Sequence, residues 1–552
     1  EKNIEKFLIS NSKLNFTNTI LSDMAFWNPS ELIGDNPNPL DYSIFREIFT
    51  KNSWNKGLSR IGYSKIDCEL MEKYGNKPYI NLNYAFYSLI PENINDKLKL
   101  KLIDFYKNKL KNNLSSHDKI EFEIVFSCYD FNTSQRLYEL IDYGFSEDEV
   151  GEISNELIKL TLSILTNYKK LFETDKKSLG KLESIRLKTI KKLTNCSDPY
   201  KYLESFLDLL NKLNEYGTPQ FATMARNAFI AKALLKSILD TKYIDQNEYD
   251  YFMQNISTIA HEFDNDFKKY IANQMSKSIF DTKYGHLRWG TYDIRAKRYD
   301  QISFSKDYCS DKIIENENDN ITIKLDKLET ILNNSIFSKI PLSEFLHFIQ
   351  SSIKEREYFK YEFTNSLSTA IELLAEAGKI LGFDRDQLSY LDIPSIKSYV
   401  FYNSKYELIS FLESSIKNSK EQYHKNLTIT LPAIIQNKND FRIIKHEIQR
   451  PNFITQKTTE GDLIHLENDH TINISDKILV ISKADPGFDW IFTKNIKGLI
   501  TKYGGAGSHM AIRCAEFNIP AAIGCGEQIF KMLLNCSSIK LDCKRNKIIK
   551  IY

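Results

Sequence analysis

The sequence contains no apolar run that approaches the ~18 residues needed to cross a bilayer, and its start lacks the charged-then-apolar pattern of a secretory signal. The sequence also lacks a large excess of charge of either sign, because it contains 74 Lys and Arg and 72 Asp and Glu. No strong field therefore favours nucleic acid or a membrane surface as a partner. We expect a cytoplasmic protein that binds neither.

Cysteine pairs at metal-binding or redox spacing are absent as well. The eight cysteines are scattered and form no C-x-x-C pair, which favours neither zinc nor a disulfide framework. We expect reduced, mostly buried thiols, with Cys525 as a small buried side chain. The chain begins with Glu1 in place of a methionine, within a stretch of helical pattern. We therefore expect it to be the C-terminal part of a longer protein.

At 552 residues and 64.4 kDa the chain is too long for one hydrophobic core, and about three or four domains are expected. Up to about residue 145, helical patterns alternate with a loop rich in turn residues, 34–39. Apolar residues then recur at helical spacing over 153–280 and again over 324–425. Gly382 stands where a helix would end. These stretches predict a helical bundle.

The pattern changes after about residue 435 to short β-like runs separated by turns. We predict strands at 478–481, 498–501 and 520–523, and a hairpin at 539–552. The sequence therefore predicts a mainly helical region over residues 1–435, with room for two subdomains. A small α/β domain over residues 436–552 is predicted to follow it.

One histidine stands out in this second part. The strand predicted at 498–501 leads into a glycine-rich turn, and a helix is predicted from Met510. His509 thus lies at a helix N-terminus, where the helix dipole disfavours a charged imidazolium and favours a bound anion. A neutral imidazole nitrogen is the nucleophile that phosphoryl transfer through histidine requires. We predict that His509 carries a phosphoryl group.

The turn before His509 contains residues suited to phosphate: Gly504, Gly505, Gly507 and Ser508. Glycines let backbone N–H groups approach an anion closely, and the serine hydroxyl can add a donor. We predict that these four residues bind the phosphoryl group. A histidine that only caps a tight turn is the alternative interpretation of so short a motif.

The longer segment GLITKYGGAGSHMAIRCAEFNIPAAIGCGE, residues 498–527, resembles the phosphohistidine signature of the phosphoenolpyruvate-utilising enzymes. The resemblance implies that His509 takes the β-phosphoryl group of ATP at one domain and swings to an acceptor at another. Gly507 stands where many pyruvate phosphate dikinases have a regulated threonine, so we do not expect that regulation. The predicted fold class is a multidomain protein with a large, mainly α-helical acceptor-binding region followed by a small α/β phosphohistidine swivelling domain.

The order of these domains is similar to that of the rifampin phosphotransferases, in which an ATP-grasp domain comes first. No ATP-grasp pattern is visible in these residues, and no acceptor barrel follows the histidine domain, which disfavours phosphoenolpyruvate as the product. The resemblance therefore implies that ATP and Mg²⁺ bind to an N-terminal ATP-grasp domain, the partner of this chain in the intact protein. We expect the chain alone not to hydrolyse ATP to AMP.

Four further segments resemble the L-glutamine kinases of capsular phosphoramidate biosynthesis: SDMAFWNPSELIGDNPNPL, HDKIEFEIVFSCYDF, YGHLRWGTYDIRAKRYD and RPNFIT. This resemblance implies that ATP, L-glutamine and water give AMP, phosphate and glutamine phosphorylated on its side-chain amide nitrogen. Two alternatives stay open. One is another small acceptor, such as an organic acid or an antibiotic, and the other is a non-catalytic carrier that a separate kinase phosphorylates on His509.

A glutamine site should offer a guanidinium to the α-carboxylate and a carboxylate to the α-ammonium group. The segment 284–300 contains both kinds of residue. We predict that Arg288, Asp293 and Arg295 position the acceptor and that His286 accepts a proton from it. A salt-bridge network that ties helices together is the alternative interpretation.

Other polar residues receive structural interpretations. Arg356 and Lys360 lie one helical turn apart and could meet phosphate, but a solvated basic face is the commoner explanation. His117 beside Asp118 is interpreted as a helix cap. His261 has no second ligand one turn away, so we assign it no metal.

Overall fold

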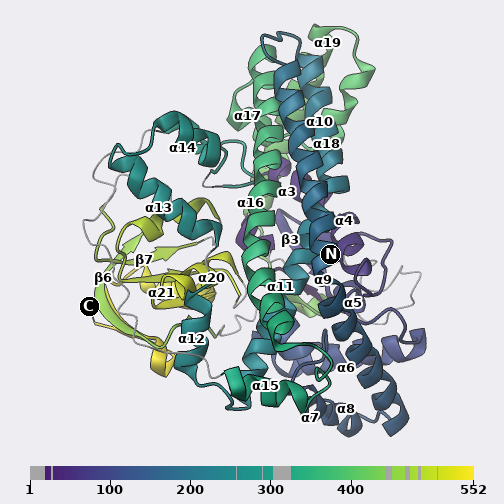
Figure 1. The fold of residues 1–552 in the computed structure, drawn as a ribbon. Helices are drawn as coiled ribbons and strands as arrows, with labels where there is room; N and C mark the ends of the chain where they lie inside the picture. The colour runs from purple at the N-terminus through teal and green to yellow at the C-terminus, as the bar shows by residue number, and fades with distance from the viewer. Residues whose placement is uncertain are drawn as a thin grey trace.

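The computed structural model describes residues 19–25, 29–256, 258–288, 290–302, 325–441, 450–466, 473–482, 486–505 and 508–551. A tall helical region and a smaller α/β domain lie side by side, with the C-terminus on the outer edge of the α/β domain (Figure 1). This architecture confirms the predicted fold class, in which a large, mainly helical region precedes a small α/β domain.

The first part of the chain combines short helices with a four-stranded antiparallel sheet in the order β2-β3-β1-β4. The sequence patterns did not predict this sheet, because two of its strands have only two residues and show no period. The strand β4 pairs with β1, so the chain returns to this sheet after the whole helical region. The elements are β1 (Leu21–Ser22), α2 (Pro29–Leu32), α3 (Pro39–Phe45), α4 (Ser53–Ser59), β2 (Met71–Tyr74), β3 (Lys77–Asn81), α5 (Leu82–Tyr87), α6 (Asp96–Asn112), α7 (Thr133–Arg136), α8 (Tyr138–Asp142) and β4 (Ile434–Ile435).

Long helices form the bundle that the apolar spacing predicted. The longest begins with a capping box, in which Ser146 and Glu149 each accept a hydrogen bond from the backbone N–H of the other. Another ends at Gly382, whose φ of +91° is the left-handed conformation that glycine adopts easily. The helices are α9 (Glu147–Lys192), α10 (Pro199–Tyr216), α11 (Thr218–Asp240), α12 (Gln246–Gln254), α13 (Ile259–Ile271), α14 (Lys277–Tyr284), α15 (Leu325–Asn333), α16 (Leu342–Leu381), α17 (Arg385–Ser389), α18 (Ile393–Lys397) and α19 (Lys405–Leu427).

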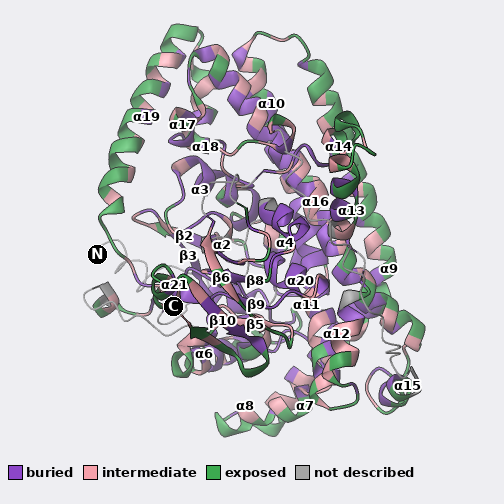
Figure 2. Ribbon diagram, turned by 90° about the vertical axis from the view of Figure 1, so that its left-hand side faces the viewer, coloured by how far each residue is buried: buried purple, intermediate pink, exposed green. Residues whose placement is uncertain are grey.

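The helix α16 is the centre of the bundle, where it packs against α10 and α11. Its residues Leu367 and Ile371 are fully buried. Buried residues concentrate where these helices meet, whereas α19 turns a largely exposed face to solvent (Figure 2). Burial of apolar side chains on α16 holds the helical region together and places its polar residues at fixed positions.

The C-terminal domain contains a seven-stranded sheet in the order β11-β10-β6-β7-β8-β9-β5. Four central strands, β6 to β9, are parallel, and the outer pairs are antiparallel. The predicted strands 478–481 and 498–501 are confirmed to the residue. The elements are β5 (Asn452–Ile454), β6 (Thr458–His465), β7 (Ile478–Ile481), β8 (Gly498–Thr501), α20 (His509–Glu516), β9 (Ala521–Ile523), α21 (Gly526–Leu533), β10 (Ser538–Asp542) and β11 (Lys547–Lys550).

Alternate residues of the parallel strands serve two separate cores. Leu479 and Leu499 face a core that α20 shares with α13 and α14, whereas Val480 and Ile500 face the side covered by α21. The helices α13 and α14 therefore pack on the C-terminal sheet, although they precede it by about 200 residues. Figure 1 shows them above this domain, beside the bundle.

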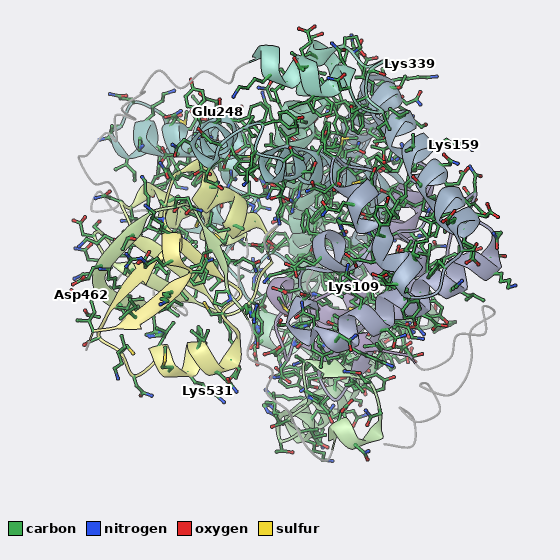
Figure 3. All side chains as sticks on the ribbon, turned by 90° about the horizontal axis from the view of Figure 1, so that it is seen from below. Lys109, Lys159, Glu248, Lys339, Asp462 and Lys531 are labelled. Carbon is green, nitrogen blue, oxygen red and sulfur yellow. The ribbon has the colours of Figure 1, made fainter. Side chains whose placement is uncertain are left out.

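Charged side chains of both signs are spread over the outer surface, as the balanced composition predicts. Lys159 and Lys339 point outward from the helical region, and Asp462 and Lys531 do so from the C-terminal domain (Figure 3). No helix among the described residues is long and apolar enough to span a membrane.

Candidate functional site

His509 lies at the carboxyl end of the parallel strands. The strand β8 ends at Thr501, and α20 begins at His509 with Ser508 as its N-cap. The Ser508 Oγ accepts a hydrogen bond from the backbone N–H of Ala511 at 3.2 Å. In open α/β sheets this edge is where ligands bind, so the fold places the predicted carrier histidine at a binding edge.

Two carboxylates face the two nitrogens of the His509 ring. Nδ1 lies 3.0 Å from Glu357 Oε2 of α16, and Nε2 lies 2.6 Å from Asp489 Oδ1 of its own domain. Carboxylates only accept, so both contacts are hydrogen bonds at once when both ring nitrogens carry protons. If the C-terminal domain moves, Asp489 can stay in contact with His509, because both belong to that domain. Glu357 can contact His509 only when the C-terminal domain is docked on the helical region.

Arg513, one helical turn after His509, supports this arrangement. Its guanidinium lies 3.2 Å from Asp489 Oδ2 and 2.8 Å from Glu516 Oε2, and it donates to the Thr258 Oγ1 at 2.9 Å. It is almost fully buried. The fork of Arg513 therefore fixes the Asp489 carboxylate that in turn orients the His509 ring.

The surrounding charges keep these carboxylates ionised. Burial works to raise the pKa of Glu357, but the hydrogen bond and charge of His509, with Lys360 and Arg356, hold it well below its usual range. Burial is likewise the largest influence on Asp489, and the charges of Arg513 and His509 outweigh it and lower its pKa. The docked histidine thus sits between two carboxylates that remain anionic at neutral pH.

The glycine-rich turn approaches β9 from the adjacent strand. Gly504 has a φ of +131°, and the Gly505 carbonyl accepts a hydrogen bond from the Ser508 N–H at 3.0 Å. Gly507 lies outside the described residues. Gly505, Ser508 and His509 line one cavity, so the structure brings these predicted phosphate-site residues together.

Gly524 controls how close this turn can come. A Cβ atom at Gly524 would lie 2.1 Å from the Gly504 carbonyl oxygen, and its φ of +73° disfavours any side chain. We expect Gly524→Ala to lower the free energy of unfolding by roughly 1–3 kcal/mol more than Gly144→Ala, because overpacking adds to backbone strain. Gly144 is the matched control, since its φ is +98° and a Cβ there meets nothing within 4 Å.

Thermal unfolding of the two variants measures this difference. We also expect Gly524→Ala, and not Gly144→Ala, to slow phosphorylation of His509, since the displaced turn leads directly into it. Equal losses of stability in the two variants would contradict the close approach of the turn to Gly524.

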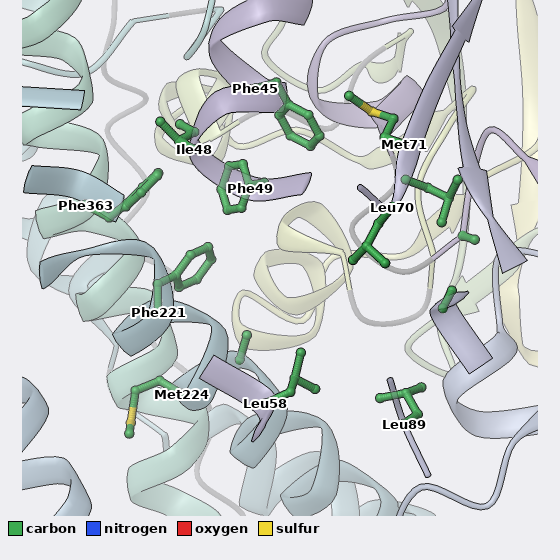
Figure 4. Close-up of a cluster of buried hydrophobic side chains, with 14 of the residues drawn as sticks. Phe45, Ile48, Phe49, Leu58, Leu70, Met71, Leu89, Phe221, Met224 and Phe363 are labelled. Atoms are coloured by element: carbon green, nitrogen blue, oxygen red, sulfur yellow. The ribbon is translucent and has the colours of Figure 1, made fainter. Parts of the chain in front are cut away.

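The cavity beside His509 lies between the two parts of the molecule. One wall is aromatic: Phe49, Phe221 and Phe363 pack with ring centroids 5.4–6.4 Å apart and point toward one another (Figure 4). Further described lining residues come from the segment 118–122, from α11 and from α16. The charged ones are Asp118, Lys119, Glu121, Arg356 and Lys360. The cavity therefore presents an apolar wall and groups of both charges to His509.

Arg356 and Lys360 are not on the solvated basic face that their spacing favoured. Arg356 is 9% exposed, its guanidinium lies 5.4 Å from the Phe229 ring centre, and both residues line the cavity with His509. The helix α16 turns this side toward the C-terminal domain, which the sequence could not show. Two cations in the cavity beside His509 are suited to bind a phosphoryl group.

The predicted acceptor residues lie elsewhere on the segment 284–300. Arg288 is buried and pairs with Glu372 at 2.8 Å, and Arg295 forms a two-pronged pair with Asp293. From this segment, the described lining residues of the cavity beside His509 are Thr291 and Tyr292. The ion pairs match the alternative of a salt-bridge network, and a role in acceptor binding stays a prediction.

His286, the predicted proton acceptor, is buried, and its ring packs edge-on against Tyr361 at 4.7 Å. Burial and the charges of Arg298, Arg186 and Arg288 hold its pKa well below the usual value. The imidazole is therefore neutral and a weak base. Its role as proton acceptor also stays a prediction.

Sequence reasoning missed Glu357, Asp489 and Arg513, although each contributes directly to the setting of His509. Arg513 could have been found from its position four residues after His509 on one helix face. The other two had no signal, because neither belongs to a motif. Cys525 is buried as predicted, and the described cysteines are all free.

Comparison with known proteins agrees with this geometry. Residues 474–546, which include His509, match the family described as PEP-utilising enzyme, mobile domain. The chain is 28% identical over 187 residues to a rifampicin phosphotransferase of Bacillus subtilis (strain 168), a match that covers 31% of this chain and 20% of that protein. A rifampicin phosphotransferase of Bacillus cereus is 28% identical over 192 residues, 32% of this chain and 21% of that protein.

The chain thus matches about a fifth of the length of these curated relatives. The family match covers the region in which β8, the glycine turn and α20 present His509. Residues 474–546 are thus similar to the mobile domain of PEP-utilising enzymes, and about a third of the chain is similar to part of the rifampicin phosphotransferases.

Proposed function

We propose that this chain is a phosphotransferase that carries a phosphoryl group on His509 to a small acceptor in the cavity between its two parts. The observation that carries the proposal is the place of His509. It begins a helix in the region similar to a mobile domain, and it faces a cavity lined by Arg356 and Lys360 of the helical region. The proposed carrier histidine and the cationic residues of the proposed acceptor site thus line the same cavity.

The residues at the site support each part of such a transfer. Arg356 and Lys360 offset the negative charge of the phosphoryl group as it moves. The bond between phosphorus and the ring nitrogen breaks, a bond to the acceptor forms, and the proton of the acceptor returns to the released ring nitrogen. When one ring nitrogen carries phosphorus, the other can still donate a hydrogen bond to the carboxylate that faces it, which holds the ring in place during the transfer.

L-glutamine, phosphorylated on its side-chain amide nitrogen, is our leading acceptor. Support comes from the four sequence segments that resemble the L-glutamine kinases and from the presence of both charges in the cavity, which suits a zwitterion. ATP is the proposed donor: its β-phosphoryl group passes to His509 at the ATP-grasp domain, AMP leaves, and water takes the γ-phosphoryl group as phosphate. We assign Mg²⁺ to the same domain, where it would neutralise the charge of the ATP phosphates.

A second candidate acceptor is a rifampicin-like antibiotic. The two relatives are named for rifampicin, and the aromatic wall of Phe49, Phe221 and Phe363 suits an apolar acceptor. The two candidates differ in charge, size and polarity, so one assay separates them.

The test runs the transfer in reverse, which needs no ATP. The chain is incubated with phosphorylated glutamine or with phosphorylated rifampicin, and the intact mass of the protein is recorded. We expect glutamine phosphate to add one phosphoryl group, located by peptide mass on His509. Uptake from the rifampicin compound alone would replace glutamine by the second candidate, and uptake from neither would favour a carrier module that a separate kinase phosphorylates.

A further inference from the structure

Asp118 occupies an unusual position in the cavity beside His509. It belongs to the cavity-lining segment 118–122, and its Oδ2 accepts a hydrogen bond from the Asn452 side chain of the C-terminal domain at 3.3 Å. Its other oxygen, Oδ1, is buried and has no hydrogen-bond partner among the described residues. A buried carboxylate oxygen without a partner costs free energy, and in a binding cavity a ligand can supply that partner.

The other acidic groups near the cavity are already neutralised. Glu121 pairs with Arg226 at 2.8 Å, and Glu357 is held by His509. Asp118 forms no ion pair within the described residues, and the ammonium of the adjacent Lys119 donates to the Arg450 carbonyl at 3.1 Å. Burial raises the pKa of Asp118, so a cation that binds beside it would relieve an energetic cost.

The rest of the cavity is suited to the same cation. Rings of Phe49, Trp54 and Tyr292 line it, and aromatic faces attract ammonium groups. Arg356 and Lys360 of α16 line the same cavity, so one of them can bind the anionic end of a ligand while the other offsets the charge of the phosphoryl group. The lining therefore has a carboxylate for a cation and cations for an anion.

We propose that Asp118 binds the protonated amine of the acceptor and thereby selects acceptors that carry both an ammonium and an anionic group. The proposal rests on the proposed transfer from His509 and narrows it to zwitterionic acceptors. Because Asn452 of the C-terminal domain holds the same carboxylate, the amine site is complete only when that domain is docked.

The experiment compares two ligands that differ only in the amine: L-glutamine and 4-carbamoylbutanoate, which is glutamine without it. Binding to the whole chain is measured by calorimetry. We expect the wild type to bind L-glutamine at least about 10-fold more tightly than the analogue, as a hydrogen bond to a charged group predicts. Asp118→Asn should remove this preference by weakening L-glutamine roughly 10- to 100-fold and leave the analogue unchanged.

Two controls separate recognition from structure. Glu123→Gln changes a carboxylate on the same stretch of chain that bonds to Ser116 at 2.6 Å, and it should keep the wild-type preference. Asn452→Ala removes the side-chain hydrogen bond from the C-terminal domain to Asp118 and should weaken L-glutamine more than the analogue, because the carboxylate that binds the amine is then less firmly held.

The inference is overturned if the wild type binds the two ligands equally, if it binds neither, or if Asp118→Asn weakens both to the same extent. Transfer provides the separate readout for the proposed function. A chain that binds L-glutamine with the expected preference, yet exchanges no phosphoryl group with it, would support the role of Asp118 and count against the phosphotransferase.

Discussion

His509→Gln should abolish phosphorylation of this chain. Glutamine keeps polar atoms near Asp489 and Glu357 but offers no imidazole nitrogen to form a bond with phosphorus. Phosphoramidate, a small chemical donor that phosphorylates histidine, supplies the phosphoryl group without an ATP-binding domain. Intact mass and peptide mass then show how much phosphoryl each protein carries and where.

The matched control is His261→Gln, which changes a partly exposed histidine that stacks on Phe517. This variant should take up phosphate at position 509 as the wild type does. Phosphate that persists at the wild-type level in the His509→Gln protein, on any residue of the cavity, would refute the carrier role. Because His509 is only 4% exposed, its uptake also reports how often the domain leaves the docked position.

The second large effect is expected for Glu357→Gln, which should slow transfer from phosphorylated His509 to the acceptor at least about 30-fold, the equivalent of ~2 kcal/mol for breaking a buried charged pair. Uptake from phosphoramidate should not fall, because that step takes place when His509 is away from α16. The expected result is therefore a split between the two half-reactions, which a loss of folding would not produce.

Glu355→Gln, two residues earlier on the same helix, is the control and should leave both half-reactions unchanged. The wild type should also show a distinctive pH dependence. The pKa of Glu357 in the docked state is lower than that of a free carboxyl group. The free energy that Glu357 adds to docking is therefore fully present above the free carboxyl pKa, and it is lost as the pH falls through the lower pKa of the docked state. Equal slowing of uptake and transfer by Glu357→Gln would contradict a role that begins on docking.

The C-terminal domain could be predicted well because its signals are local. Strands 478–481 and 498–501 appear in the sequence as apolar runs between turns, and the glycines and Ser508 indicate the start of α20. The predicted bundle helices were also found, since an apolar stripe at helical spacing depends only on neighbours in sequence. The small sheet that joins β1 to β4 was missed, because a two-residue strand carries no period and its partner is about 410 residues away.

The sequence alone predicted His509 as the carrier and the type of domain that holds it, because a strand, a glycine turn and a helix N-terminus within a dozen residues define the local geometry. Tertiary structure alone decided what His509 meets. Glu357 is 152 residues and Asp489 is 20 residues from it, and neither belongs to a motif. Their meeting, and the turning of Arg356 and Lys360 from solvent toward the cavity, follow from the packing of α16 against the C-terminal domain, a long-range contact that no local pattern encodes.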